Sequence, residues 1–166
     1  FVVTADRAFA QVIATCAESR DDRRDTWINP DIEDAFCDLH RMGHAHSIEC
    51  WLGYALVGGL YGMAMGRAFF GESMFSRATD ASKVALAWLI ARMRVGGFEL
   101  LDCQFMTDHL AAMGAEPAWA LLSLSLASRP SSCLSRNAAV FSMESLCTAM
   151  PALRAAIKAQ NARAVV

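Results

Sequence analysis

Residues 45–70 show the pattern of three short strands connected by glycine-containing turns, which restricts the chain to folds with an antiparallel sheet. The segment 46–51 alternates polar and apolar residues with period two, as a strand with one buried face does. Gly53 and Gly66 suit the turns between strands. We therefore expect an antiparallel meander followed by a loop over 71–79. The other two strands of the meander are predicted at 55–65 and 67–70.

Helices are predicted before and after this meander. Apolar residues recur at i, i+3, i+4 and i+7 from Phe9 to Cys16, which is one face of a helix, and Thr4 is its expected N-cap. Asn29 as a cap and Pro30 at the first helical position start a second helix, which Gly43 stops. The remaining predictions are a helix over 80–94, a buried strand over 98–104, and a short helix that begins after Thr107 and ends at Gly114.

Composition narrows the class of protein. The 166 residues are 55% apolar and 19% charged, which suffices for one domain with a hydrophobic core and excludes a disordered chain. The net charge of −2 does not by itself indicate a nucleic-acid binder. Six scattered Cys residues without paired spacing argue against a disulfide framework or a zinc ribbon. We recognise no secretory leader and no membrane span, so we expect a cytoplasmic protein.

The amino-acid composition of the chain changes after Glu116. The remaining residues are rich in Ala, Ser and Leu and contain one acidic residue, Glu144, against five basic residues. We therefore divide the chain into a first domain over 1–116 and a divergent tail over 117–166. Helices are predicted in this tail at 118–127 and 152–162.

The predicted strand over 98–104 contains two polar residues, Asp102 and Gln104, among apolar ones. Residues i and i+2 share a strand face, so the two side chains are expected to point the same way. A carboxylate in apolar surroundings is costly unless it has a partner. Asp102 is therefore either a structural acid that caps the next turn or a residue of a functional site.

Other polar residues carry weaker signals. Glu72, between Gly71 and Ser73, fits either an ordinary turn glutamate or a site residue beside a close backbone approach. Three closely spaced histidines resemble the ligands of a metal site. They are predicted at a helix end, in a turn and at a strand start, so their side chains need not converge and we expect no metal site. Phosphate-binding glycine motifs are absent. These histidines are His40, His44 and His46.

Several longer sequence motifs occur in the same order as in a known protein family. The chain over 1–116 closely resembles the bacterial leucyl/phenylalanyl-tRNA–protein transferases in these strings, of which the one around Glu72 is highly specific. They are Thr26-Trp27-Ile28, Gly43-His44-Ala45-His46-Ser47-Ile48-Glu49, Leu56-Val57-Gly58-Gly59-Leu60-Tyr61-Gly62, Gly71-Glu72-Ser73-Met74-Phe75-Ser76-Arg77, Asp80-Ala81-Ser82-Lys83 and Leu101-Asp102-Cys103-Gln104.

The resemblance implies a fold and a reaction. The implied fold is α+β and similar to the GNAT acetyltransferases: a mixed, mainly antiparallel sheet flanked by helices on both faces. The implied reaction moves Leu or Phe, and Met less well, from aminoacyl-tRNA to the N-terminal Arg or Lys of an acceptor protein. That product is tagged for degradation by the N-end rule. No coenzyme A or other cofactor is implied, and we expect a monomer.

The resemblance also implies roles for single residues. Asp102 matches the aspartate proposed to accept or orient the proton of the attacking amine, and Gln104 matches the glutamine linked to it by hydrogen bonds. Glu72 matches a glutamate of the substrate site, with Gly71 beside it. Trp27 matches an aromatic residue that stacks on the terminal adenosine of the tRNA. The positions that match the apolar pocket for the transferred side chain are Leu60, Met74, Leu89, Met93 and Leu101.

Two departures from the family keep other interpretations open. The family has an N-terminal region before the residue that matches Phe1, and the similarity ends at Glu116, where a shifted reading frame or a divergent, partly disordered tail begins. Residues 1–80 carry seven basic and twelve acidic residues, so they do not replace a basic tRNA surface. The alternatives to the transferase are a truncated, inactive remnant of that enzyme and another acyltransferase on the GNAT fold.

Overall fold

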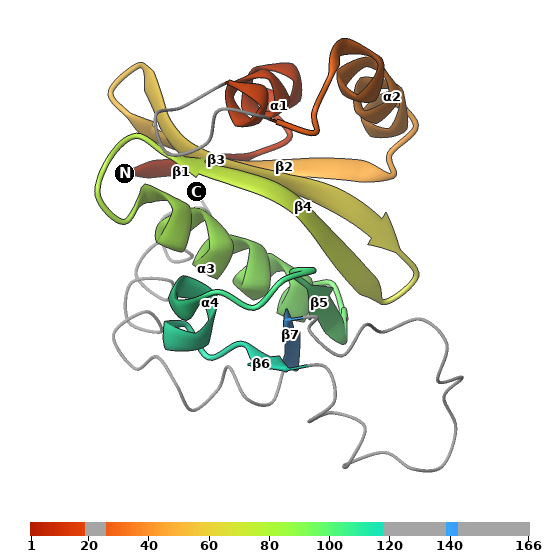
Figure 1. Cartoon of the computed structure of the whole chain (residues 1–166), viewed down its shortest axis with the longest axis vertical. Helices are drawn as coiled ribbons and strands as arrows, with labels where there is room; N and C mark the ends of the chain where they lie inside the picture. Colours follow the sequence, from red (N-terminus) through yellow and green to blue (C-terminus); the bar gives the residue numbers. More distant parts are fainter. Residues whose placement is uncertain (19–25, 118–138, 143–166) are drawn as a thin grey trace. The chain divides into compact units, whose positions relative to one another are not determined.

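The computed structural model describes residues 1–18, 26–117 and 139–142 (Figure 1). These residues fall into two compact units. Unit 1 comprises Phe1–Met65 and Gly71–Ile90, and unit 2 comprises Gly66–Phe70 and the described residues from Ala91 onward. The helices predicted at 118–127 and 152–162 lie outside the described residues. The predicted division of the chain at residue 116 stays a prediction.

Unit 1 is built on the predicted meander. Its strand order is β1-β2-β3-β4, and β2 is antiparallel to both β1 and β3, with Ile48 opposite Leu60 and a register shift at Cys50/Trp51. The strand before Asp6 was not predicted, and the prediction of a loop from residue 71 was wrong, because residues 71–76 continue a strand. The strands are β1 (Val2–Ala5), β2 (Ala45–Leu52), β3 (Ala55–Met65) and β4 (Ala68–Ser76).

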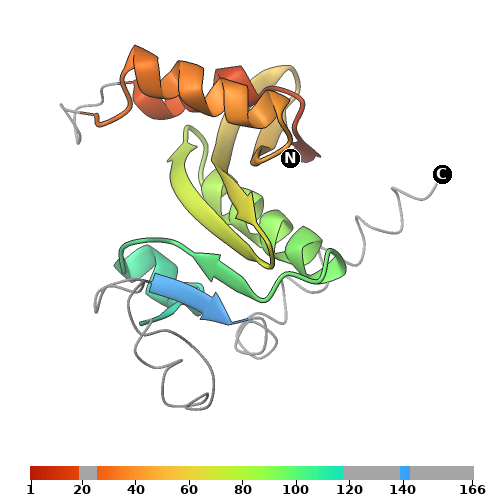
Figure 2. The same ribbon diagram turned by 90° about the vertical axis from the view of Figure 1, so that its right-hand side faces the viewer.

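Helices cover both faces of this sheet (Figures 1 and 2). Helices α1 (Phe9–Ala17) and α2 (Pro30–Arg41) lie on one face, and residues 81–90 of α3 (Ala81–Val95) lie on the other. The start of α2 is confirmed, because the Asn29 side chain accepts a hydrogen bond from the backbone N–H of Ile32 at 3.0 Å. The N-cap predicted for α1 was wrong: Thr4 belongs to β1, and Ala8 precedes the helix.

An aromatic and aliphatic core joins α1 and α2 to the sheet. The ring of Phe9 stacks on His40 with centroids 4.3 Å apart and meets Tyr61 edge-on at 5.9 Å, while Phe36 of α2 meets Tyr61 at 5.1 Å. Burying such side chains is the main favourable term in folding. The buried members of the cluster are Phe9, Val12, Ile13, Cys16, Ile28, Ala45, Leu56, Tyr61 and Phe75.

The paired glycines of β3 allow other elements to approach the strand closely. A Cβ atom at Gly58 would lie 2.5 Å from the Cβ of Ala81 at the start of α3, and 2.9 Å from the carbonyl carbon of Ala81. A Cβ atom at Gly59 would lie 2.9 Å from the carbonyl oxygen of Ile48. At Gly58 the strand therefore packs against the backbone of α3, and at Gly59 it packs against β2 and the Phe75 side chain, so neither position has room for a side chain.

Adding a methyl group at Gly58 is expected to destabilise unit 1. We expect Gly58→Ala to lower the free energy of unfolding by about 1–3 kcal/mol, because the new Cβ atom must displace the first turn of α3. Urea unfolding followed by circular dichroism measures this. The double variant with Ala81→Gly removes one of the clashing atoms and should recover part of the loss. A single variant as stable as the parent would contradict the packing.

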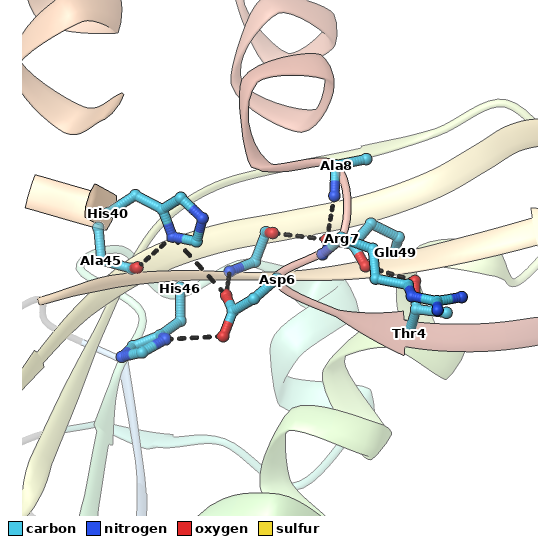
Figure 3. A network of polar contacts seen from close by, with 9 residues as sticks. Thr4, Asp6, Arg7, Ala8, His40, Ala45, His46 and Glu49 are labelled. Atoms are coloured by element: carbon cyan, nitrogen blue, oxygen red, sulfur yellow. Dashed lines mark hydrogen bonds and ion pairs between the residues drawn. The ribbon is translucent and has the colours of Figure 1, made fainter. Parts of the chain in front are cut away.

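A buried polar network fastens the start of α1 to β2 (Figure 3). The Glu49 side chain is fully buried, and its Oε1 accepts hydrogen bonds from the Ser47 hydroxyl at 2.6 Å and from the backbone N–H groups of Arg7 and Ala8 at 3.3 and 3.4 Å. Its Oε2 accepts from the Thr4 hydroxyl. The carboxylate thus supplies the acceptor that α1 lacks from its own N-cap side chain.

A second carboxylate extends this network at the surface. Asp6 accepts a hydrogen bond from the backbone N–H of Ser47 and one from His46 Nδ1, each at 2.9 Å. His40 Nδ1 donates to the carbonyl oxygen of Ala45 at 2.8 Å and lies 3.9 Å from Asp6 Oδ1. Residues from β2, from the last turn of α2 and from the link between β1 and α1 therefore meet at Asp6.

Unit 2 contains the parallel part of the sheet. Ala68–Phe70 of β4 pairs in parallel with β5 (Leu100–Asp102), with Phe70 opposite Asp102. Strand β7 (Ala139–Ser142) is antiparallel to β5 and pairs with β6 (Glu116–Pro117). Neither β6 nor β7 was predicted from the sequence. The strand predicted over 98–104 is shorter than expected, because it ends at Asp102.

The short helix of unit 2 begins as predicted. Helix α4 (Asp108–Ala112) is capped by Thr107, whose hydroxyl accepts a hydrogen bond from the backbone N–H of Leu110 at 3.2 Å. Among the described residues of both units, no helix is long and apolar enough to cross a membrane. The observed architecture is a mixed, mainly antiparallel sheet with helices, which confirms the predicted α+β class.

Candidate active site

Unit 1 carries the predicted site residues Leu60, Gly71, Glu72, Met74 and Leu89, besides Trp27. Gly59 and Phe75 face the α1 side of the sheet, since a Cβ at Gly59 would contact Phe75 and Val12. Because strand side chains alternate, Leu60, Glu72 and Met74 share the opposite face, toward residues 81–90 of α3. The structure therefore brings these three residues to one face of the sheet, which includes the segment wrongly predicted as a loop.

Trp27 lies at the entrance to α2, two residues before its cap. Its side chain is 49% exposed, whereas the following residue, Ile28, is buried in the core. The hydroxyl of Thr26 accepts a hydrogen bond from the backbone N–H of Ile28 at 3.2 Å, which holds the segment in place. A large exposed aromatic side chain on an anchored segment is suited to stacking against a planar ligand.

Unit 2 carries Met93, Leu101, Asp102 and Gln104. Asp102 ends β5, and its Oδ1 accepts a hydrogen bond from the backbone N–H of Gln104 at 2.7 Å. Gln104 has φ of +62°, in the left-handed region that residues other than glycine seldom occupy. The backbone N–H of Phe105 donates to the carbonyl oxygen of Cys103 at 2.7 Å, which completes a tight turn after the strand.

This turn corrects the geometry predicted for the polar pair. The shared strand face was derived from an extended backbone through residue 104, but the strand ends at Asp102 and Gln104 is left-handed. Strand alternation therefore does not relate the two side chains. Asp102 does cap the following turn, as one of the two sequence interpretations held. Its role in a reaction stays a prediction.

Cys103 lies between the two polar residues and remains a neutral thiol. Burial and, to a smaller extent, the neighbouring charge of Asp102 raise the pKa of the Cys103 thiol to about 12. Since the thiolate is the reactive form of cysteine, Cys103 is not an activated nucleophile at neutral pH. A reaction at this turn would therefore not pass through a covalent thioester on Cys103.

Four of the five apolar positions predicted for a pocket are buried: the exposed fractions are 3% for Leu60, 5% for Leu89, 2% for Met93 and 0% for Leu101. Such burial is equally typical of core residues. Met74 is the partly exposed member. By alternation along β5, Leu101 points away from Asp102, as expected. Their role as a pocket stays a prediction.

Sequence reasoning missed the polar network around Glu49 and Asp6. The signal was present in the alternation of β2, which places Ser47 and Glu49 on the same face as the core residue Ala45. A glutamate at an inward position needs several donors, and the sequence alone does not name them. Among the described residues, no group of three or more metal-ligating side chains is arranged to hold a metal ion.

Comparison with known proteins identifies the family. The family model described as leucyl/phenylalanyl-tRNA protein transferase matches residues 1–119. A protein of that name from Rhizorhabdus wittichii is 70% identical over 115 residues, which are 69% of this chain and 46% of the relative. One from Zymomonas mobilis is 69% identical over 115 residues, which are 43% of that relative. The chain thus spans less than half the length of these two relatives.

Solved structures that resemble this one show the same fold at low identity. A putative GNAT-family acetyltransferase from Desulfovibrio desulfuricans aligns with a TM-score of 0.55 and 12% identity over 86% of this chain and 99% of its own. A GNAT-family acetyltransferase from Brucella melitensis, solved in complex with acetyl-CoA, aligns with a TM-score of 0.57 and 8% identity over 85% of this chain and 88% of its own. The fold is therefore GNAT-like, and the chain belongs to the leucyl/phenylalanyl-tRNA protein transferase family.

Proposed function

We propose that this chain transfers Leu or Phe, and Met less well, from aminoacyl-tRNA to the N-terminal Arg or Lys of acceptor proteins. The tagged proteins would be directed to degradation by the N-end rule, in the cytoplasm. The observation that carries the proposal is that the family match over 1–119 includes every residue assigned to the site. We further propose that the chain acts as a monomer and without a cofactor.

The chemistry is the aminolysis of an ester. The α-amine of the acceptor attacks the carbonyl carbon of the aminoacyl ester, a C–N bond forms, and the bond to the 3′-terminal ribose oxygen of the tRNA breaks. The amine must be neutral when it attacks and must then lose a proton, while the leaving oxygen must gain one. Holding the two reactants in line removes much of the entropic part of the barrier.

The described residues supply candidates for these roles. Asp102 would accept or orient the proton of the amine, and Gln104 would hydrogen-bond the reacting groups. Glu72 would position polar atoms of the aminoacyl end, where Gly71 leaves space for close backbone approach. The neutral thiol of Cys103 supports direct attack by the amine without a covalent intermediate on the enzyme.

The substrate preference would follow from the apolar positions. The transferred side chain would contact the apolar positions that the family resemblance names, which are Leu60, Met74, Leu89, Met93 and Leu101. Leu and Met side chains, which are not branched at Cβ, suit Leu and Phe and disfavour β-branched substrates by shape. Apolar pockets discriminate single methylene groups only modestly, so Met transfer is expected at a reduced rate.

The direct test is a transfer assay with the full 166-residue chain. Purified protein is incubated with radiolabelled Leu-tRNA and an acceptor protein that begins with Arg, and the label in the acceptor is counted. The matched control is the same acceptor beginning with Glu. Transfer to the Arg acceptor alone supports the proposal. Absence of transfer by a chain that circular dichroism shows to be folded would favour the inactive remnant. Acetylation of the acceptor from acetyl-coenzyme A would favour another acyltransferase.

Trp27 provides a prediction about tRNA binding. We expect Trp27→Ala to raise KM for Leu-tRNA about 5- to 150-fold, because stacking on a base is worth about 1–3 kcal/mol. The exposed side chain contributes little to the core, so the fold should persist. Trp27→Phe retains an aromatic face and should recover most of the affinity. Equal KM values for the Ala variant and the parent would remove Trp27 from the site.

A further inference from the structure

We propose that His46, oriented by Asp6, is a further catalytic residue of the transfer reaction, with its Nε2 atom as the base that removes a proton from the α-ammonium group of the acceptor. The inference rests on the proposed function, because it names the group that prepares that acceptor for attack. Three observations within unit 1 carry it. They are the face of the sheet on which His46 lies, the hydrogen bond at its Nδ1 atom, and the exposure of its ring.

His46 lies on the face of the sheet that carries the unit 1 residues assigned to the substrate. Glu49 points toward the start of α1, so alternation along β2 places His46 and Ile48 on the opposite face. Ile48 is paired with Leu60 of β3, which is one of those residues. Figure 3 shows the imidazole on the side of the strands away from α1. The residue of β3 paired with His46 is Gly62, so the position directly across from the imidazole carries no side chain.

The Asp6 carboxylate fixes the orientation of the imidazole. Its Oδ2 lies 2.9 Å from Nδ1 of His46, while its Oδ1 accepts a hydrogen bond from the backbone N–H of Ser47, also at 2.9 Å. Asp6 is itself held, since its backbone N–H donates to the carbonyl oxygen of Ser47 at 3.1 Å. An ionised carboxylate can only accept, so Nδ1 carries the proton and the lone pair of the neutral imidazole is on Nε2.

His46 differs in its surroundings from His40, the other histidine near Asp6. The ring of His40 stacks on Phe9, and its Nδ1 donates to the carbonyl oxygen of Ala45 at 2.8 Å, as expected for a structural residue. The side chain of His46 is 37% exposed, and within the described part of the chain its Nε2 atom makes no hydrogen bond. A basic nitrogen on a fixed and accessible ring is the arrangement of a general base.

The proton that His46 removes must leave the acceptor before the attack. An α-amino group has a pKa of about 7.7–8.0, so most of the acceptor is an α-ammonium ion at neutral pH and has no lone pair for the ester carbonyl. One N–H bond breaks on the acceptor and one forms at Nε2, which leaves a neutral amine and an imidazolium cation. Asp6 stabilises this cation, which later returns its proton to water. The second proton of the amine, lost after the attack, is the one assigned to Asp102.

Other titratable and charged groups surround His46 on each neighbouring element. Asp6 lies on the link between β1 and α1, His40 of α2 is 3.9 Å from Asp6, and Glu72 of β4 is on the same face of the sheet as His46. Of residues 81–90 of α3, only Lys83 is charged, and it forms an ion pair at 2.6 Å. Histidine is the side chain that changes charge near neutral pH. A pH dependence that changes on substitution of His46, with His40 intact, therefore reports on His46 or on the acceptor amine.

Two substitutions of His46 in the full chain test the catalytic role. His46→Asn keeps a nitrogen donor in the place of Nδ1 but has nothing in the place of Nε2, and His46→Ala lacks both. We expect kcat/KM for Leu transfer at pH 7 to fall about 10²-fold in each variant. The matched control is His44→Ala, at an exposed histidine of the preceding turn, which should stay within about twofold of the parent. Undiminished transfer by both His46 variants would overturn the inference.

Two readouts separate a base from a structural residue in variants that circular dichroism shows to be folded. At pH 8.5 most of the acceptor amine is already neutral, so the deficit of the His46 variants should shrink about five- to tenfold between pH 6.5 and 8.5. Added imidazole should restore part of the rate of His46→Ala, because it supplies the missing base. A deficit that is constant with pH and insensitive to imidazole would mean a structural role and overturn the inference.

The orientation of the ring is tested by NMR of the imidazole nitrogens of His46. The parent should carry the proton on Nδ1. In Asp6→Asn the amide oxygen still accepts from Ser47, so the amide nitrogen faces His46, donates to Nδ1 and moves the proton to Nε2. This variant should lose as much transfer as His46→Asn. A parent with the proton on Nε2 would overturn the inference alone, whereas a folded parent that transfers no Leu would defeat the proposed function and the role of His46 with it.

Discussion

Asp102→Ala is expected to lower kcat/KM for Leu transfer by about 10²–10⁴-fold, the factor typical of a positioned proton-transfer group. Its side chain is only partly buried and lies at the end of a three-residue strand, so few core contacts are lost. The free energy of unfolding should therefore fall by less than about 2 kcal/mol, mainly for the hydrogen bond to Gln104. Transfer kinetics and urea unfolding on the same preparation measure the two effects.

The control for this experiment removes an acid of the same kind nearby in the sequence. Asp108 is exposed in the first turn of α4, and Asp108→Ala should leave kcat/KM within about twofold of the parent. The catalytic assignment of Asp102 is wrong if its alanine variant unfolds the chain while the activity per folded molecule is unchanged.

Glu49→Ala is expected to produce the largest loss of stability. The fully buried carboxylate accepts four described hydrogen bonds, from two hydroxyl groups and two backbone N–H groups. Its removal leaves these donors unpaired and opens a cavity, so we expect the free energy of unfolding to fall by about 3–5 kcal/mol. Urea unfolding followed by circular dichroism measures the change.

Two further variants serve as comparisons for the loss of stability in Glu49→Ala. Glu49→Gln preserves the volume of the side chain but replaces one acceptor oxygen with a donor, so its loss should be intermediate. Asp34→Ala, at an exposed acid on α2, should change stability by less than about 0.5 kcal/mol. A Glu49→Ala variant as stable as Asp34→Ala would show that the network does not hold α1 to the sheet.

Local chemistry made several elements predictable from the sequence. Asn29 and Thr107 cap α2 and α4 as expected, because their short side chains accept hydrogen bonds from backbone groups three residues later. The period-two pattern of β2 and the apolar face of α1 were likewise sufficient to predict these elements, because each pattern follows from the local geometry of a strand or a helix. Each of these signals lies within a few residues of the element that it defines.

The candidate site was only partly predictable. The sequence named Asp102, Gln104 and Glu72 through a family resemblance, and it drew attention to Asp102 through a carboxylate in an apolar strand. It did not show that the strand ends at Asp102, because the bond from the Gln104 amide to the Asp102 side chain competes with continued strand geometry. It also did not predict that Glu72 and Met74 lie in β4, since Gly71 and Ser73 favour a loop locally.

The sequence by itself determined the meander, the positions of α1 to α4 and the membership of the family, because capping, periodicity and motif strings are local properties. Only the tertiary structure decided that Thr4 joins a strand, that β4 continues to Ser76 and that Glu49 is buried among hydroxyl and amide donors. The physical reason is that these outcomes depend on pairing with other elements of the fold, and Thr4 and Glu49, for example, are 45 residues apart in the sequence. A backbone hydrogen bond in a sheet, or a donor to a buried carboxylate, exists only once the chain has folded.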